Sequence, residues 1–345
     1  MIECYPWQQE IWHKIMQSQK YWKHALILKG KRGIGKYAFA RCLVQSLLCH
    51  LPKADRMACG HCISCGWFEQ NGHPNFYSVM PDALSATSDD DKTNTASKES
   101  STAKTQKTLS QQITVDQIRR LNDFIYHTGH QDGYKVILVY PAETMTLAAA
   151  NALLKKLEEP PADVLFILVT HLVQHLLPTI RSRCQQIAMP IPSIETSMIW
   201  LKQQGINNPE VILPLNDFSP LSAWSFVQDQ LTLPHQHFIE QITSEQKFDP
   251  LTLSQLLQSV SLSTVTSWLQ KWCYDLVSYR TTGKIRYYLQ FQSIIQALSQ
   301  RINLIACITF ARELNNHQKL STHPLNARLF LEEMFIRYRH VVREK

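Results

Sequence analysis

A glycine-rich segment near the start of the chain constrains the fold more than any other feature. It reads G-K-R-G-I-G-K-Y over residues 30–37, which matches the phosphate-binding loop pattern G-x-x-x-x-G-K-[S/T] at every position except the last. An apolar run, Ala25 to Leu28, precedes the segment, and a stretch rich in apolar residues, Phe39 to Leu48, follows it. The pattern therefore predicts a strand, a tight turn and a helix, the opening of an α/β domain with a parallel sheet.

The loop keeps its phosphate contacts but lacks a magnesium ligand. Gly30, Gly33 and Gly35 let backbone N–H groups close around phosphates, and Lys36 would reach the β- and γ-phosphate oxygens of a nucleotide. The last position of the pattern normally supplies a hydroxyl to Mg²⁺, whereas Tyr37 carries its hydroxyl at the far end of a ring. We therefore expect a degenerate site with weak nucleotide binding or none.

A second part of the nucleotide site is also altered. Lys135 to Tyr140 predicts a buried strand, and a working P-loop ATPase needs an acidic residue at the end of such a strand to hold Mg²⁺. Tyr140 and Pro141 stand there instead, and Glu143 lies too far along the chain to take that role. Because two magnesium-associated positions are unsuitable in one chain, an inactive site is favoured over an unusual active one.

Four of the nine cysteines form a compact cluster after the predicted P-loop helix. Cys59, Cys62 and Cys65 make two overlapping C-x-x-C units, and Cys49 lies upstream of them. In a reducing compartment this spacing indicates Zn²⁺ held by four thiolates rather than disulfides. A site filled by four protein ligands is structural, and we interpret it as a folding staple rather than a nucleic-acid contact, with His61 as an alternative ligand.

Strand and helix patterns alternate through the first part of the chain. Phe76 to Met80 and Val164 to Val169 read as strands, and Leu147 to Glu159 reads as a helix closed by two prolines. Between the first of these strands and the helix, residues 82–112 are dominated by Ser, Thr, Asp, Lys and Gln, which predicts a disordered surface insertion. After about residue 189 the spacing of apolar residues becomes helical throughout.

Length and charge limit the class of protein. The chain has 345 residues, 44% of them hydrophobic, and a formal net charge of +7. This permits contact with nucleic acid without requiring it. No run of about 18 apolar residues is present, and the first residues lack an apolar signal core, so we expect a cytoplasmic protein without a membrane span.

Three further motifs carry a resemblance to a known family. The run N-A-L-L-K-K-L-E-E-P-P over residues 151–161, then Phe166 to Thr170, then Ser182-Arg183-Cys184, are similar to the AAA+ clamp-loader family. The Cys₄ insertion after the P-loop helix resembles the clamp-loader subunits of bacterial DNA polymerase III. The similarity spans about residues 5–189 without the insertion.

The resemblance implies a domain order. It implies an AAA+ P-loop domain over 1–189 with a zinc module at 49–65, a small helical lid domain over 190–226, and an all-α collar domain for oligomerisation over 227–345. The family's lid carries an arginine after a Gly-Ser pair, whereas this chain has Phe218-Ser219-Pro220 without an arginine there.

The resemblance also implies roles for single residues. Arg183 would be an arginine finger that acts in trans on ATP bound in a neighbouring subunit, since a planar, permanently charged guanidinium stabilises phosphate charge. An ion pair with a local carboxylate is the alternative for this residue. Thr170 matches the sensor-1 position, or caps the following turn if the site is inactive.

The implied function is that of a non-hydrolysing clamp-loader subunit in the DNA polymerase III holoenzyme. Its partners would be the ATPase subunits, the clamp-opening subunit, the sliding clamp and primed DNA, in a hetero-oligomer with ATP in neighbouring subunits. One alternative is an active DNA-dependent ATPase motor with a non-standard magnesium site. Another is a free-standing zinc protein that binds nucleic acid.

Overall fold

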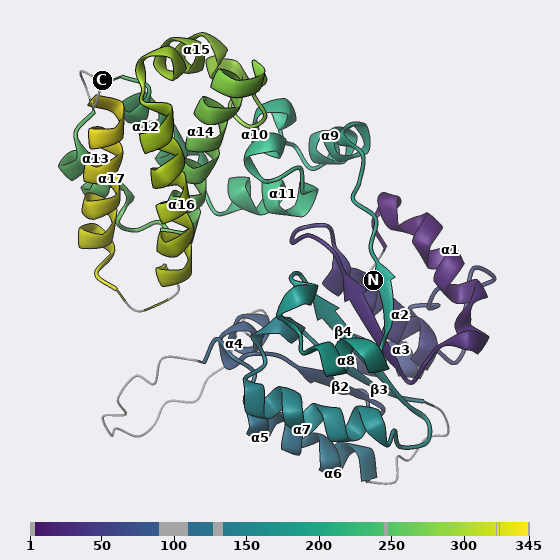
Figure 1. The fold of residues 1–345 in the computed structure, drawn as a ribbon. Helices are drawn as coiled ribbons and strands as arrows, with labels where there is room; N and C mark the ends of the chain where they lie inside the picture. Colours follow the sequence, from purple (N-terminus) through teal and green to yellow (C-terminus); the bar gives the residue numbers. More distant parts are fainter. Residues whose placement is uncertain are drawn as a thin grey trace, which may run out of the picture. The chain divides into compact units, whose positions relative to one another are not determined.

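The chain folds into two compact units, Met1–Pro192 and Ser193–Lys345. The computed structural model describes residues 4–89, 110–126, 134–244, 248–321, 323 and 325–343 (Figure 1). Each unit has its own apolar core and is considered by itself.

The first unit is built on a five-stranded parallel sheet with strand order β2-β3-β4-β1-β5. Its strands are β1 (Ala25–Lys29), β2 (Phe76–Val79), β3 (Lys135–Val139), β4 (Val164–Thr170) and β5 (Gln185–Ala188). The central strands β1 and β4 are apolar except for their last residues, Lys29 and Thr170, because helices cover both faces of the sheet. The predicted α/β class and four of these strands are confirmed, while β5 gave no clear signal in the sequence.

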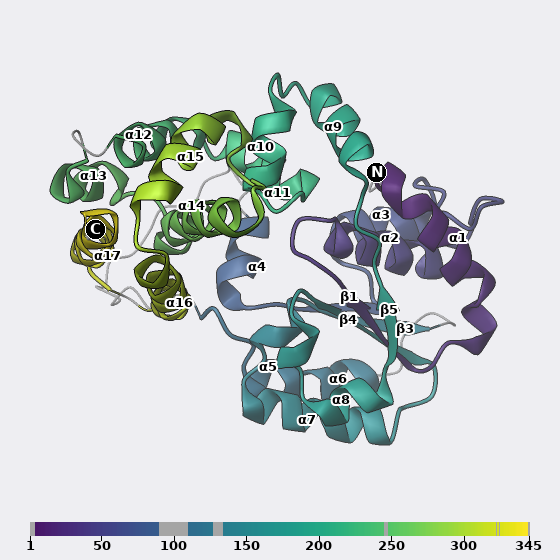
Figure 2. The same ribbon diagram turned by 45° about the horizontal axis from the view of Figure 1, so that its top comes forward.

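Alternate side chains of β1 serve the two faces. Leu26 and Leu28 enter the core beneath one group of helices, whereas Ala25 and Ile27 enter the core of the other. Figure 2 shows these two groups on opposite sides of the sheet. The first comprises α1 (Gln9–Gln17), α2 (Lys36–Leu48) and α3 (Ile63–Glu69), and the second α5 (Val115–Arg119), α6 (Leu121–Tyr126), α7 (Leu147–Glu158) and α8 (Pro178–Arg183).

Helix α4 (Asp82–Asp89) corrects the expectation of disorder from residue 82 onward. The carbonyl of Pro81 accepts from the N–H groups of Leu84 and Ser85. The Gln117 side chain donates to Met80 O and Asp82 Oδ1, at 2.9 Å each. These contacts to α5 fix the start of a segment whose composition alone is too polar to predict a helix. The remainder of the expected insertion, 90–109, lies outside the described residues.

In the described residues of the second unit, every regular secondary-structure element is a helix. Its helices are α9 (Ile194–Gln203), α10 (Pro209–Leu215), α11 (Pro220–Gln228), α12 (Thr232–Ile242), α13 (Pro250–Leu257), α14 (Leu262–Thr282), α15 (Gln292–Arg301), α16 (Leu304–Leu320) and α17 (Ala327–Arg343). A small apolar cluster joins α9 to α11, and a larger one surrounds α14. Within the larger cluster, the indole of Trp272 donates to Tyr338 Oη at 2.7 Å.

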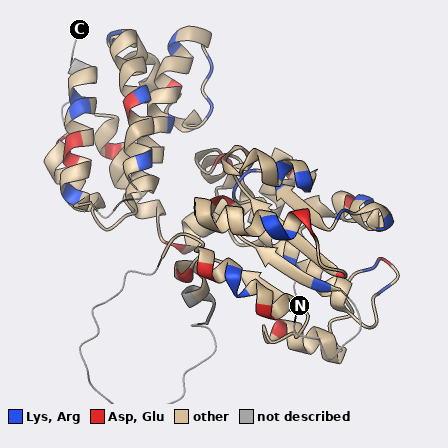
Figure 3. Cartoon of the chain, turned by 60° about the horizontal axis from the view of Figure 1, so that its bottom comes forward, with Lys and Arg blue, Asp and Glu red and all other residues tan. Residues whose placement is uncertain are grey.

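Charged residues are distributed over both units. Figure 3 shows acidic and basic residues interspersed along the ribbon, in agreement with the modest net charge of +7. In the described part of the chain no single helix has the length and hydropathy of a membrane span, although the bent pair Leu289–Arg301 and Leu304–Leu320 meets that test when taken together.

A buried carboxylate, Asp275, fixes the loop that follows α14. Its oxygens accept the backbone N–H groups of Arg286, Tyr287 and Tyr288 at 2.9, 2.9 and 2.7 Å. Burial raises the pKa of this carboxyl above its usual range, although these three hydrogen bonds oppose the rise. Asp275 therefore holds the end of the loop, while Ser278 Oγ donates to the Lys284 carbonyl at 2.8 Å nearer its start.

We predict that Asp275→Ala lowers the free energy of unfolding of the second unit by roughly 3 kcal/mol, because buried N–H groups lose their acceptor. Urea denaturation followed by hydrogen exchange in peptides spanning 262–291 measures this loss. Asp229→Ala, which removes an exposed carboxylate, is the matched control. A loss no greater than that of the control would contradict the structural role of Asp275.

Candidate functional site

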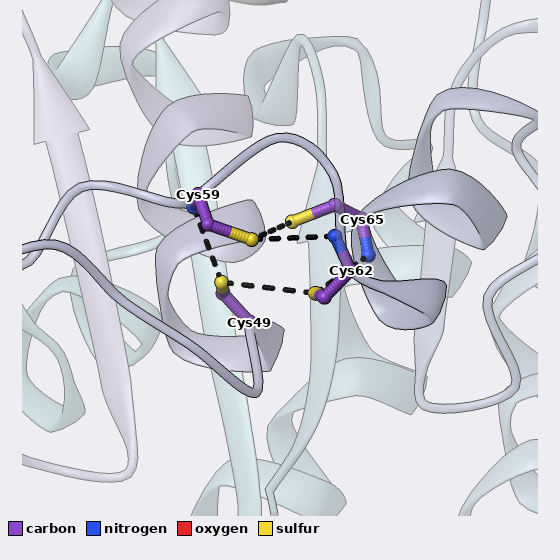
Figure 4. Close-up of side chains that lie close together, drawn as sticks. All are labelled: Cys49, Cys59, Cys62 and Cys65. Carbon is purple, nitrogen blue, oxygen red and sulfur yellow. Dashed lines mark hydrogen bonds between the residues drawn. The ribbon is translucent and has the colours of Figure 1, made fainter.

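The four clustered cysteines converge in space (Figure 4). The sulfurs of Cys49 and Cys62 are 3.9 Å apart, those of Cys59 and Cys65 are also 3.9 Å apart, and all four lie within 4.8 Å of one another. A tetrahedral Zn²⁺ with Zn–S bonds of about 2.3 Å requires sulfurs about 3.8 Å apart. His61 stays outside the cluster, with its ring nitrogen 3.0 Å from the Cys59 carbonyl. The four thiols can therefore hold one metal ion.

Backbone N–H groups prepare these sulfurs to carry negative charge. Cys59 N donates to Cys49 Sγ, Cys62 N to Cys59 Sγ and Cys65 N to Cys62 Sγ, at 3.3 to 3.4 Å. Burial opposes ionisation of Cys62, but hydrogen bonds from the backbone of Cys65 and His50 outweigh it and lower its pKa to about 6. A thiolate is the form that ligates metal, so these hydrogen bonds favour binding at Cys62, whereas burial raises the pKa values of Cys49 and Cys65.

A buried polar chain lies beside the cysteine cluster. Ser64 Oγ donates to the Leu48 carbonyl at 2.5 Å and accepts from His73 Nε2 at 2.9 Å, while His73 Nδ1 accepts from Asn75 N at 3.0 Å. Burial lowers the pKa of His73 below its usual value, which favours the neutral ring that this arrangement needs. These hydrogen bonds tie the end of α2 to α3 and to the start of β2. The sequence did not predict the contact between Ser64 and His73, because no local pattern marks His73.

The glycine loop forms the predicted turn between β1 and α2. Gly33 and Gly35 have φ angles of 77° and 85°, in the left-handed region that favours glycine. Lys36 is the first residue of α2, and its Nζ donates to the carbonyl of Gly30 at 2.6 Å and to that of Lys31. The lysine that would meet a nucleotide's phosphates is thus bonded to the carbonyls of its own loop.

The charge of Lys36 is held in a largely buried position, since the residue is only 2% exposed. Burial lowers its pKa to about 8, Arg32 adds to that effect and the carboxylate of Glu143 opposes it. The ammonium is therefore still mainly protonated at neutral pH.

The chain's own N-terminal segment packs against the loop. The Trp7 indole and the Gln8 side chain both donate to the Ile34 carbonyl at 3.0 Å, and the Tyr5 ring stacks on Trp7 with centroids 4.9 Å apart. A methyl group added at Gly35 would lie 2.5 Å from the Tyr5 ring. The segment therefore covers part of the loop from which α2 begins.

The structure brings together the two residues that depart from the magnesium-binding pattern. The rings of Tyr37, in α2, and Tyr140, just after β3, stack with centroids 4.5 Å apart and planes inclined by 27°. The edge of His171 lies against Tyr140 at 5.7 Å. Two aromatic side chains thus meet where the pattern calls for a hydroxyl and a carboxylate around a hydrated cation.

Glu143 and His171 complete the environment of the loop. Glu143 Oε1 accepts from the backbone N–H of His171 at 3.0 Å, whereas Glu143 Oε2 and His171 Nδ1 are buried without a hydrogen-bond partner among the described residues. Burial and the neighbouring charge of Lys36 lower the pKa of His171 to about 4. Thr170, the last residue of β4, is fully buried, and its Oγ1 accepts from Leu172 N at 3.2 Å. Its hydroxyl therefore caps the turn that follows the strand.

Arg183 ends helix α8 on the surface of the first unit. Its Nη2 forms an ion pair with Glu158 Oε1 at 2.7 Å, and its Nη1 donates to the Thr179 carbonyl at 3.1 Å. The neighbouring Cys184 is buried, and burial raises the pKa of its thiol to about 12. The guanidinium of Arg183 is thus accessible but held within its own chain.

The first unit thus combines a parallel α/β sheet, a glycine-rich turn between β1 and α2, and four thiols that could hold one metal ion. The model of the family described as "DNA polymerase III, delta subunit" matches residues 7–193. The chain belongs to this family.

Curated relatives agree with that assignment. The DNA polymerase III subunit delta' of Pseudomonas aeruginosa is 32% identical over 288 residues, which cover 82% of this chain and 80% of the relative. The subunit of the same name from Haemophilus influenzae is 29% identical, with 81% and 79% covered, and that from Escherichia coli K12 is 31% identical, with 66% and 62% covered. The resemblance seen in the sequence, which within the loader points to the delta-prime subunit, is confirmed.

Among solved structures, a DNA polymerase III gamma-subunit-related protein of Thermotoga maritima aligns with 18% identity and a TM-score of 0.45. The alignment covers 97% of this chain and all of that one.

We predict that the purified full-length chain carries about one divalent metal ion, and that Cys62→Ser loses most of it because three thiolates hold a tetrahedral ion less tightly than four. Inductively coupled plasma mass spectrometry of protein purified without chelators measures the content. Cys4→Ser, outside the cluster, is the control and should keep the metal. Equal metal content in Cys62→Ser and native protein would contradict a four-thiol site.

Proposed function

We propose that this chain is a non-hydrolysing subunit of the DNA polymerase III clamp loader, acting in replication to help place the sliding clamp on primed DNA. The observation that carries the proposal is the stacking of Tyr37 on Tyr140 at both magnesium-associated positions, in a chain of the delta-subunit family. Relatives named DNA polymerase III subunit delta' support the assignment to this complex.

Four features of this chain argue against hydrolysis of ATP. The stacked tyrosines provide neither a hydroxyl nor a carboxylate to Mg²⁺, and Lys36 is bonded to loop carbonyls. The segment around Tyr5 covers Gly35, and helix α11, which follows Phe218 and Ser219, contains no arginine to serve as a second sensor. Gly30 and Gly33 then act as a structural turn, and ATP is bound by neighbouring subunits instead.

Arg183 acts on that neighbouring ATP as an arginine finger. Its exposed position at the end of α8 suits a contact in trans, and its ion pair with Glu158 is only partly buried. Pairs of this kind contribute about 0–1 kcal/mol, so a nucleotide's phosphates can displace the carboxylate. The geometry of the single chain is compatible with both a local pair and a finger.

The metal held by Cys49, Cys59, Cys62 and Cys65 is a structural Zn²⁺. All four coordination positions are supplied by the protein, so the ion would cross-link the segment between α2 and α3 without binding substrate. The module stabilises the first unit, and its Ser64–His73 contact transmits that order to β2.

The second unit divides into two functional parts. Residues 190–226, with the small apolar cluster of α9 to α11, form a lid, and residues 227–345, with the larger cluster around α14, form a collar for hetero-oligomerisation. The partners are the loader's ATPase subunits, its clamp-opening subunit, the clamp and primed DNA. We place the protein in the cytoplasm with the replication machinery.

One observation favours a second candidate, an active motor subunit with a non-standard magnesium site. Glu143 Oε2 is buried without a partner near Lys36, so a carboxylate is present at the edge of the site. This candidate requires hydrolysis by the isolated chain.

We predict that Arg183→Ala slows hydrolysis at the neighbouring site on the order of 10³-fold, because the transition-state charge loses its guanidinium. Single-turnover hydrolysis by the reconstituted loader with clamp and primed DNA measures the rate, and gel filtration checks assembly. Arg181→Gln, two residues away, is the control. If the loader containing Arg183→Ala assembles and hydrolyses ATP at the native rate, Arg183 is not an arginine finger.

We also predict that the isolated chain neither hydrolyses ATP nor binds it with a Kd below about 1 mM. Titration of a fluorescent ATP analogue with Mg²⁺, followed by anisotropy, tests binding, and phosphate release tests hydrolysis. Saturable binding and turnover that Lys36→Ala abolishes would instead establish the motor-subunit candidate.

A further inference from the structure

The ion pair of Arg183 occupies the groups that a phosphate would need. Nη2 lies 2.7 Å from Glu158 Oε1, and Nη1 donates to the Thr179 carbonyl at 3.1 Å. Both terminal nitrogens of the guanidinium therefore have acceptors within the chain. The two charged side chains are 35% and 49% exposed, so water and ligands can reach the pair.

The position of Glu158 is not explained by the stability of its own helix. It is the last residue of α7, and a carboxylate at a helix C-terminus is disfavoured by the helix dipole. Arg183 is its one ion-pair partner among the described residues. The carboxylate instead neutralises a cation presented by a different helix, α8.

We propose that Glu158 is a positioning residue for Arg183, holding the guanidinium in a restrained state until the terminal phosphate of a nucleoside triphosphate in a neighbouring subunit displaces the carboxylate. The proposal rests on the role in trans assigned to Arg183 above. A phosphate carries more negative charge than a carboxylate, and a closed interface excludes the water that screens the pair. Exchange of one anion for the other needs no rearrangement of the backbone.

The ion pair restrains the Arg183 guanidinium only weakly, because both side chains are partly exposed and water screens their charges. An ion pair of this kind shifts an equilibrium by at most about fivefold, which corresponds to about 1 kcal/mol. Removing the carboxylate therefore affects the loader most when engagement of the finger is incomplete, before clamp and DNA close the assembly. Once the assembly is closed, the phosphate outcompetes the carboxylate and the residue has little effect.

The test is ATP hydrolysis by the complete reconstituted loader containing Glu158→Gln, with and without clamp and primed DNA. We expect the rate without clamp and DNA to rise by about two- to fivefold, and the fully stimulated rate to stay within about twofold of native. Glu159→Gln removes the same charge from the adjacent exposed residue and should change neither rate. Glu158→Asp, which keeps the charge, should restore part of the restraint.

A double variant shows whether the effect passes through Arg183. Glu158→Gln combined with Arg183→Ala should match Arg183→Ala alone, because the carboxylate then has no finger to restrain. A rise that persists in the double variant would overturn the proposal. So would an unchanged or lower unstimulated rate in Glu158→Gln, provided that the loader assembles and melts as native.

The two proposals fail in distinguishable ways. If Arg183→Ala slows hydrolysis while Glu158→Gln leaves the unstimulated rate unchanged, the finger stands and only the role of Glu158 is overturned. If Arg183→Ala leaves the rate unchanged, both are overturned.

Discussion

Strand β1 is hydrogen-bonded to β4 on one side and to β5 on the other, and its side chains enter the cores on both faces of the sheet. Lys29 pairs with Thr170 and with Ala188, so three strands end together at the edge where the glycine loop turns. Parallel sheets gather functional residues at this edge because every strand delivers its C-terminal end there. The positions of α2, the glycine-rich loop and the end of β4 all follow from that pairing.

The glycine-rich turn at this edge has a structural role of its own. The turn from β1 to α2 needs left-handed backbone at Gly33 and Gly35 whether or not a nucleotide binds. Lys36 has carbonyl partners within the loop, and the rings of Tyr37 and Tyr140 stack on each other, so these three side chains have partners within the chain. The loop thus keeps a structural function in setting the direction of α2.

Local sequence patterns predicted much of the fold of the first unit and the position of the cysteine cluster. The glycine loop, the C-x-x-C spacing and the apolar runs each specify structure within a few consecutive residues, and the strands and the four-thiol cluster were found where these patterns lie. The pairing of Tyr37 with Tyr140 and that of Arg183 with Glu158 join distant segments, so no local pattern encodes them. Helix α4 escaped prediction for a similar reason, since Gln117 fixes its start from outside a polar segment.

The central claim is that this chain contributes the Arg183 guanidinium to ATP bound in a neighbouring subunit, and that the chain itself binds no ATP. A structure of the assembled loader with clamp, primed DNA and a non-hydrolysable ATP analogue tests this most directly. The account predicts density for Arg183 at hydrogen-bond distance from the terminal phosphate in the adjacent subunit, separated from Glu158, and no nucleotide beside Lys36. Nucleotide with Mg²⁺ between Lys36 and Glu143, with the two tyrosines unstacked, would contradict it.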